Sequence, residues 1–113
     1  MKIAYKKQIL ERNNSELCVV TEYPLLDSDI DFAIVKINGR YPESKRAVNL
    51  ACKEIVYVHE GQGQVEVNGE SYSLSAGDLV LIECGEKFIW EGRMMLHISC
   101  HPPFSVEQHQ HVE

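Results

Sequence analysis

The sequence is poor in basic residues and has no cluster of them. Eleven Lys and Arg stand against seventeen Asp and Glu, which gives a formal net charge of −6. Proteins that bind nucleic acid or anionic membranes group Lys and Arg so that several phosphates are neutralised together. We therefore expect neither nucleic acid nor a membrane as a partner of this chain.

Long hydrophobic runs are also absent. The longest, such as residues 79–82, fall far short of the roughly 20 apolar residues that span a bilayer. The N-terminal residues Met1–Lys7 carry no apolar signal-peptide core. These absences predict a cytoplasmic protein.

Cysteine is sparse and widely spaced, at Cys18, Cys52, Cys84 and Cys100. No C-x-x-C pair exists, so the spacing indicates neither a zinc or redox motif nor a dense disulfide framework. We expect free, buried thiols. Cys52 and Cys100 are expected to be inert, because no neighbouring base or helix N-terminus is visible to lower their pKa.

What the sequence does contain is a series of short apolar clusters rich in Val, Ile and Tyr and bounded by Gly, Asn, Asp or Pro. Such clusters are typical of strands, and only residues 7–12 could form a short helix. The predicted strands cover about residues 16–22, 31–38, 47–50, 54–59, 63–67, 71–75, 79–83, 87–91 and 94–100. A chain of 113 residues without linkers or repeats predicts a single all-β domain, a sandwich or a barrel.

Two local patterns refine this prediction. Asn68-Gly69 lies between two alternating segments and favours the tight type I′ turn of a β-hairpin. Residues 79–82 are apolar at every position, which predicts a central strand covered on both faces.

Residues 54–61, the hairpin at Asn68-Gly69 and residues 76–82 together resemble the cupin superfamily. The best-matched elements are the E-x6-G spacing from Glu54 to Gly61 and the G-D-x-V-x-I strand that begins at Gly77. The resemblance covers about residues 38–104. It implies an antiparallel jelly-roll β-barrel, the double-stranded β-helix, for the single domain 1–113. The barrel core is expected at about residues 32–104, with residues 1–14 covering a sheet edge and a tail at 105–113.

The same resemblance bears on metal binding, because cupin motifs supply three His and one Glu as ligands. The three histidine positions are occupied here by Ala47 and Asn49, or by Val48 and Leu50 with the shorter spacer, and by Phe88. Only Glu54 remains, and one carboxylate is too few donors for a transition metal. We therefore expect no metal site and no cofactor, which puts the oxygenase chemistry of metal-bearing cupins in doubt.

Glu54 shares a strand face with Val56, and the resemblance places that face inside the barrel. Desolvation would raise the pKa of a carboxyl group there and suit it to proton transfer or to anchoring ligand hydroxyls. The alternative is a structural carboxylate satisfied by Arg40, Arg46 or Asn49. Both interpretations stay open.

Phe88 and Trp90 lie two residues apart and share a face. Together with Asn49 and Glu54 they are the candidate ligand-binding residues of an aromatic-lined pocket, although the same pair could fill the barrel as core. Core filling suits Phe88 better, whereas Trp90 is expected at the rim or in the pocket.

His97 lies in a segment, residues 94–100, of which either alternating set could face inward. We favour the apolar set of Leu96, Ile98 and Cys100 over the set that contains His97. If His97 did face inward, it could pair with Glu54 as general acid and base. Glu54 and His97 are therefore the candidate catalytic residues.

Two further histidines, His109 and His111, form an H-x-H pair near the end of the chain. We expect a frayed, solvated tail there, with only adventitious metal binding.

These features predict a small cupin that binds a small organic molecule without metal and transforms it by acid–base chemistry. One alternative is a metal-dependent oxygenase or isomerase with non-standard ligands, such as Glu54, His97 and Cys100. Another is a non-catalytic sensing or interaction module. A homodimer is expected, since open jelly-roll sheets leave edges that need covering.

Overall fold

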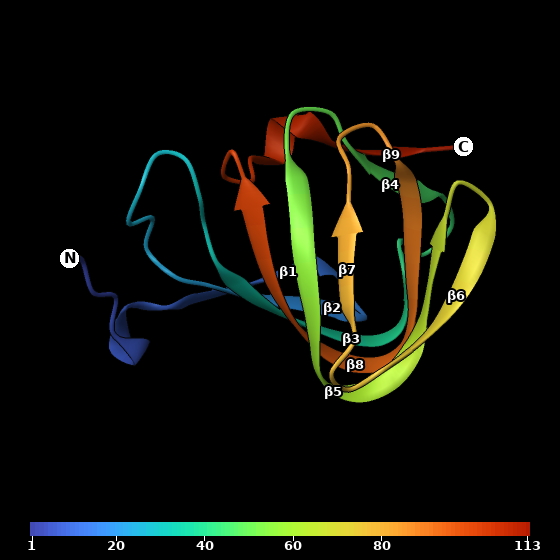
Figure 1. The fold of residues 1–113 in the computed structure, drawn as a ribbon, viewed down its shortest axis with the longest axis horizontal. Coiled ribbons are helices and arrows are strands. Elements are labelled where there is room, and N and C mark those ends of the chain that lie inside the picture. Colours follow the sequence, from blue (N-terminus) through green and yellow to red (C-terminus); the bar gives the residue numbers. More distant parts are fainter.

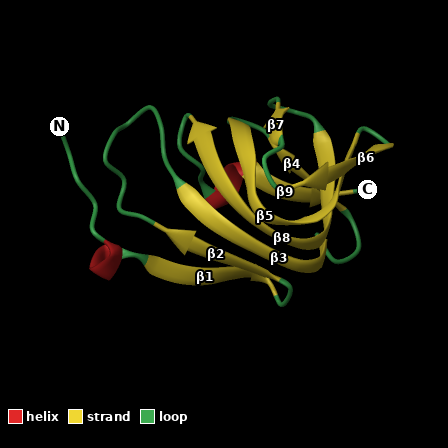
Figure 2. Cartoon of the chain, turned by 60° about the horizontal axis from the view of Figure 1, so that its bottom comes forward, coloured by secondary structure: helices red, strands yellow, loops and turns green.

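The computed structural model describes residues 1–113, and its regular secondary structure is β-strand apart from two short 3₁₀ turns (Figure 2). This confirms the predicted all-β class. In chain order the elements are the 3₁₀ turn η1 (Lys6–Gln8), β1 (Leu10–Ser15), β2 (Cys18–Glu22), β3 (Ala33–Tyr41), β4 (Arg46–Asn49), β5 (Lys53–Val67), β6 (Glu70–Ser75), β7 (Leu79–Ile82), β8 (Lys87–His101), the 3₁₀ turn η2 (Val106–Gln108) and β9 (His109–Val112).

All strand pairs are antiparallel, and the sheet follows the order β1-β2-β3-β8-β4-β9. β5 pairs along the other side of β8, and β6 and β7 both pair with β5. The sheet curls strongly, so that β4 and β9 lie across from the N-terminal strands (Figure 1). The result is an antiparallel jelly-roll half-barrel with a concave inner face.

The curl of the sheet depends on two long strands, where the sequence pattern predicts four shorter ones. β5 and β8 are 15 residues each and pair along most of their length. Where they cross the base of the barrel, Gly63 lies opposite Gly92. A Cβ atom added to Gly92, which has a φ of +133°, would lie 2.5 Å from the Gly63 Cα atom. Only glycine allows the two backbones to approach so closely.

The core lies on the concave face, and its residues alternate along the strands as expected. In β8, Leu96, Ile98 and Cys100 are buried, and in β5 Val56 and Val58 are buried between exposed neighbours. Cys18, Cys52 and Cys100 are free and buried, whereas Cys84 is exposed. The two helical turns, each of three residues, are too short to span a bilayer.

Three expectations about secondary structure are wrong. Residues 7–12 form no helix: after η1 the chain enters β1, because pairing with β2 satisfies its backbone groups. Residues 79–82 form β7, which pairs only with β5 and so lies at an edge; Leu79 and Leu81 are more than half exposed. The tail is not frayed, since β9 pairs with β4.

Candidate functional site

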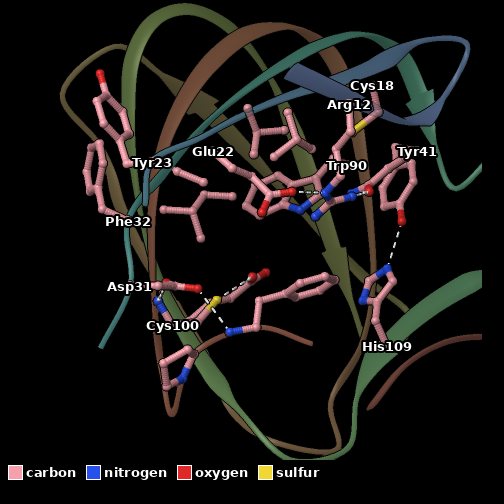
Figure 3. A pocket seen from close by; sticks show the side chains of 18 of the residues that line it. Arg12, Cys18, Glu22, Tyr23, Asp31, Phe32, Tyr41, Trp90, Cys100 and His109 are labelled. Carbon is pink, nitrogen blue, oxygen red and sulfur yellow. Dashed lines mark hydrogen bonds and ion pairs between the residues drawn. The ribbon is translucent and has the colours of Figure 1, made fainter. Parts of the chain in front are cut away.

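A cavity of about 250 Å³ opens on the concave face (Figure 3). Its apolar wall comes mainly from β2, β3 and β8 and includes Phe88, Trp90 and Phe104. Its polar wall is formed by Arg12, Asn14, Glu22, Asp31, Tyr41, Glu54 and His109. An apolar cavity with a few convergent polar groups is the usual form of a small-molecule site.

Glu54 points into this cavity from β5 and is only 6 % exposed. Burial raises the pKa of its carboxyl group to about 7, and the nearby charge of Asp31 acts in the same direction. The Cys100 thiol, with its Sγ atom 3.8 Å from Glu54 Oε2, opposes this rise only in part. The carboxyl group therefore keeps its proton to a higher pH than an exposed glutamate does.

Neither arginine considered as a partner for Glu54 contacts it. Arg40 donates to the backbone oxygens of Pro42 and Lys45, and Arg46 donates to the backbone of Glu113. Asn49, the third candidate partner, does hydrogen-bond Glu54 and lowers its pKa, but without a neighbouring cation the desolvation of the carboxylate still dominates.

Asp31 holds a second carboxylate at the cavity wall. Its Oδ1 atom accepts a hydrogen bond from the Cys100 backbone N–H at 2.7 Å, and its Oδ2 atom accepts one from the Phe104 N–H at 2.9 Å. These two bonds fix the carboxylate in place. Sequence reasoning missed Asp31, because an acidic residue in a loop gives no signal of its own.

A hydrogen-bonded chain behind the cavity fixes the tautomer of His109. Backbone N–H groups of Ala51 and Cys52 donate to Gln108 Oε1, at 3.0 and 3.3 Å, so that the Gln108 amide nitrogen faces Asn49. Asn49 Oδ1 then accepts from Gln108 Nε2 at 3.0 Å and from His109 Nδ1 at 2.8 Å. The proton of His109 therefore resides on Nδ1, and Nε2 is left as an acceptor.

The Tyr41 hydroxyl donates a hydrogen bond to His109 Nε2, with an O···N distance of 2.7 Å. His111 Nε2 lies 3.2 Å from the same hydroxyl oxygen. Burial lowers the pKa of His109 to about 4, with the neighbouring His111 and Arg12 acting in the same direction. Burial also raises the pKa of the Tyr41 hydroxyl. At neutral pH the pair is thus an uncharged imidazole that accepts a hydrogen bond from a neutral phenol. Sequence reasoning missed this pair, because the tail was expected to be solvated.

On another side of the cavity, Arg12 from β1 forms an ion pair with Glu22 and a hydrogen bond to Asn14 Oδ1. Its guanidinium carbon lies 5.2 Å from the ring centroid of Phe104, in the geometry of a cation–π contact. The charge of Arg12 is therefore balanced by Glu22, and its guanidinium group is held in place by contacts within the protein.

Phe88 and Trp90 both line the cavity and are both nearly fully buried. Their ring centroids lie 6.3 Å apart in an edge-to-face arrangement. The pair thus belongs at once to the core and to the wall of the pocket. Asn49 is placed differently: it is buried behind His109 and does not line the cavity.

His97 does not reach the cavity, which corrects its assignment as a candidate catalytic residue. It lies on the outer face of β8, where its ring stacks on His59 at a centroid distance of 4.6 Å. The physical reason is the strand period: Leu96 and Ile98 take the inner positions because burying them is more favourable than burying an imidazole.

The residues present do not fit the metal site that the family resemblance implies. No group of three or more His, Cys, Asp or Glu side chains is arranged to hold a metal ion. The non-standard set of Glu54, His97 and Cys100 is not brought together either, because His97 faces outward.

The curled antiparallel half-barrel with a cavity on its concave face defines a cupin-type protein. A family model described as "Cupin domain" matches residues 39–97, more than half of the chain, and the chain belongs to this family. No curated protein matches the sequence.

Several solved structures share the fold. Streptomyces Pac13, described as a nucleoside dehydratase and also solved with uridine, superposes with a TM-score of 0.88 at 19% identity, covering 100% of this chain and 92% of its own. KdgF from Halomonas gives a TM-score of 0.75 at 16% identity over 93% of this chain and 96% of its own. An RmlC-like cupin from Shewanella frigidimarina gives 0.71 at 14% identity over 88% of both chains. Identities this low establish the fold alone.

Proposed function

We propose that this chain binds a nucleoside-like small molecule in its cavity and removes water from it by acid–base catalysis. The observation that carries the proposal is the meeting, in one cavity, of a carboxyl group with a pKa of about 7 and a neutral imidazole with a pKa of about 4. Titratable groups whose environments separate their pKa values in this way are typical acid–base pairs. The similarity to a nucleoside dehydratase over the whole chain supports the reaction class.

Elimination of water needs both partners. A base takes a proton from carbon, the electron pair of that C–H bond forms a C=C bond, and the C–O bond to the neighbouring carbon breaks. An acid protonates the departing hydroxyl, so that water leaves and the substrate loses one H and one OH. Proton transfer by positioned side chains accelerates such steps by about 10²–10⁴-fold each.

Glu54 is the acid in this proposal, since it keeps its proton to a higher pH than an exposed glutamate. The Tyr41–His109 pair is the base: the Tyr41 oxygen accepts the substrate proton while Tyr41 passes its own proton to His109 Nε2. Asn49 holds the Nδ1 proton of His109 and so keeps Nε2 available. A base with so low a pKa requires an acidified C–H bond, so we expect a carbonyl next to that carbon in the substrate.

The remaining walls suit a flat heterocycle joined to a hydroxylated group. Phe88, Trp90 and Phe104 offer apolar ring surfaces. Arg12, Asn14 and Glu22 present both donors and acceptors, which match the carbonyl and N–H groups of a nucleobase edge.

Ligand binding can be followed in the unmodified protein because Trp90 is the only tryptophan and lines the cavity. Titration with uridine should change the Trp90 fluorescence. A Tyr41→Phe variant should still bind uridine and show the same kind of fluorescence change. Turnover is then measured by chromatography on nucleosides with a carbonyl group in the sugar. Glu54→Gln should abolish turnover and keep binding, whereas Glu16→Gln, an exposed carboxylate in the β1–β2 turn, should change neither.

If wild-type protein binds uridine but turns over no such substrate, a non-catalytic sensing module becomes the better interpretation. If it binds no nucleoside at all, the proposed ligand class is wrong.

A further inference from the structure

Charge is unevenly distributed around the cavity. The wall contains one cation, Arg12, and three carboxylates, Glu22, Asp31 and Glu54. Glu22 pairs with Arg12 and balances its charge. His109 adds no positive charge, because burial keeps it neutral at pH 7. The cavity therefore carries a net negative charge, contributed by Asp31 and by the ionised fraction of Glu54.

Asp31 contributes one of these carboxylates from the loop between β2 and β3. Two backbone N–H groups hold its carboxylate, and neither of the two ion pairs in the molecule includes it. Each carboxylate oxygen can still accept another hydrogen bond, since it has more than one acceptor site. Asp31 can thus accept hydrogen bonds from ligand hydroxyls without moving.

Asp31 and Glu54 lie on the same side of the cavity, next to Cys100. Both contact Cys100: Asp31 accepts from its backbone nitrogen, and the Cys100 thiol donates to Glu54. Figure 3 shows Asp31 and Cys100 on the opposite side of the cavity from Arg12 and Glu22. One side of the cavity is consequently rich in acceptors and negative charge, with no lysine or unpaired arginine nearby.

We propose that Asp31 and Glu54 make the cavity selective for an uncharged, hydroxyl-bearing ligand and against the phosphorylated form of that ligand, with Asp31 as the residue that determines this specificity. The proposal rests on the proposed nucleoside function and narrows it to nucleosides rather than nucleotides. Sugar hydroxyls donate to carboxylate oxygens, whereas a phosphate brings only acceptors and further negative charge. The chain's net charge of −6 adds repulsion at longer range.

Parallel titrations of the full chain with uridine and with uridine 5′-monophosphate test this selectivity. Binding is followed by Trp90 fluorescence and by calorimetry at pH 7.5 and low salt. We expect uridine to bind at least about tenfold more tightly, since repulsion between a phosphate and a partly desolvated carboxylate readily reaches that size. Asp31→Asn should reduce the ratio of the two affinities several-fold, and Glu54→Gln should shift it in the same direction.

Asp29→Asn is the matched control. It removes the same charge from the same loop, but Asp29 is exposed and does not line the cavity. Its ratio of affinities should equal that of the wild type. An equal shift in the Asp29 and Asp31 variants would contradict a local role of Asp31 and would indicate an effect of overall charge.

The other outcomes are separable. Equal affinities of wild-type protein for uridine and its monophosphate would overturn the selectivity and leave nucleoside binding intact. Absence of binding for both ligands would overturn the proposed function and this selectivity with it. Asn cannot accept hydrogen bonds from both backbone N–H groups, so Asp31→Asn could unfold. In that case Glu54→Gln decides, and an unchanged ratio there contradicts the proposal.

Discussion

Replacing Glu54 by glutamine should change how the free energy of unfolding depends on pH. In the folded chain this carboxyl group has a pKa of about 7, against an ordinary value of 4.5. Between these two pH values the folded state binds a proton that the unfolded state has lost, so stability falls as pH rises. The contribution is fully present below pH 4.5 and is lost by about pH 7, and it amounts to about 3 kcal/mol.

His109 has the opposite dependence. Its pKa is about 4 in the folded chain, against an ordinary value of 6.5. Between these values the unfolded state binds the extra proton, so stability rises with pH and is lost as pH falls towards 4. The two dependences have similar size and opposite sign, so they nearly cancel in the wild type. Glu54→Gln should expose the rise that His109 causes.

The measurement is urea unfolding at several pH values from 4.5 to 8, followed by Trp90 fluorescence. The stability of the wild type minus that of Glu54→Gln isolates the Glu54 contribution, because the other titrating groups are common to both proteins. This difference should fall by about 3 kcal/mol between pH 4.5 and pH 7.5. The same difference for Glu16→Gln should vary little, since water solvates that side chain in both states. Parallel curves for wild type and Glu54→Gln would refute the assignment of a protonated, desolvated carboxyl group.

Three further predictions concern turnover, metal and assembly. The rate of turnover should have a bell-shaped dependence on pH. It should fall above about pH 7 as Glu54 loses its proton, and below about pH 4 as His109 gains one. A rate that keeps rising above pH 8 would exclude Glu54 as the acid. Protein purified without an affinity tag or added metal should contain far less than one equivalent of Fe, Mn, Ni, Cu or Zn by elemental analysis, because no donor cluster is present; one equivalent released by Glu54→Ala would contradict this. The chain should be a homodimer by light scattering at tens of micromolar, because the edge strand β7 exposes Leu79 and Leu81. Leu81→Lys should shift the protein towards monomer. A monomeric wild type would contradict this prediction.

Part of the site could be predicted from sequence because it depends on local periodicity. The two-residue repeat of a strand sets which side chains share a face, and the motif around Glu54 fixes which face is inside. Phe88 and Trp90 follow from the same rule on β8, and both line the cavity. His97 shows the limit of the rule: the repeat gives two sets, and only the burial of the apolar set decides between them.

The rest of the site depends on contacts between residues far apart in the chain. His109 reaches the cavity only because β9 pairs with β4, where Asn49 lies opposite it. The segment that forms β9 has one apolar residue among four, so its pattern gives no strand signal. Asp31 and Arg12 lie in a loop and in a polar strand, and only the curl of the sheet turns them towards the cavity. Non-local pairing of this kind is not encoded in any short window of sequence.

The substitutions that remove the family's metal ligands also change the chemistry of the glutamate that remains. A carboxylate beside a metal cation stays ionised, because the positive charge favours its charged form. In this chain Phe88 stands at a position where the family resemblance implies a ligand histidine, and it contributes an apolar ring and no donor. Glu54 then experiences burial and the negative charge of Asp31 with no opposing cation, and its pKa rises to about 7. The absence of the histidines therefore leaves Glu54 buried without a neighbouring cation, which favours its protonated form.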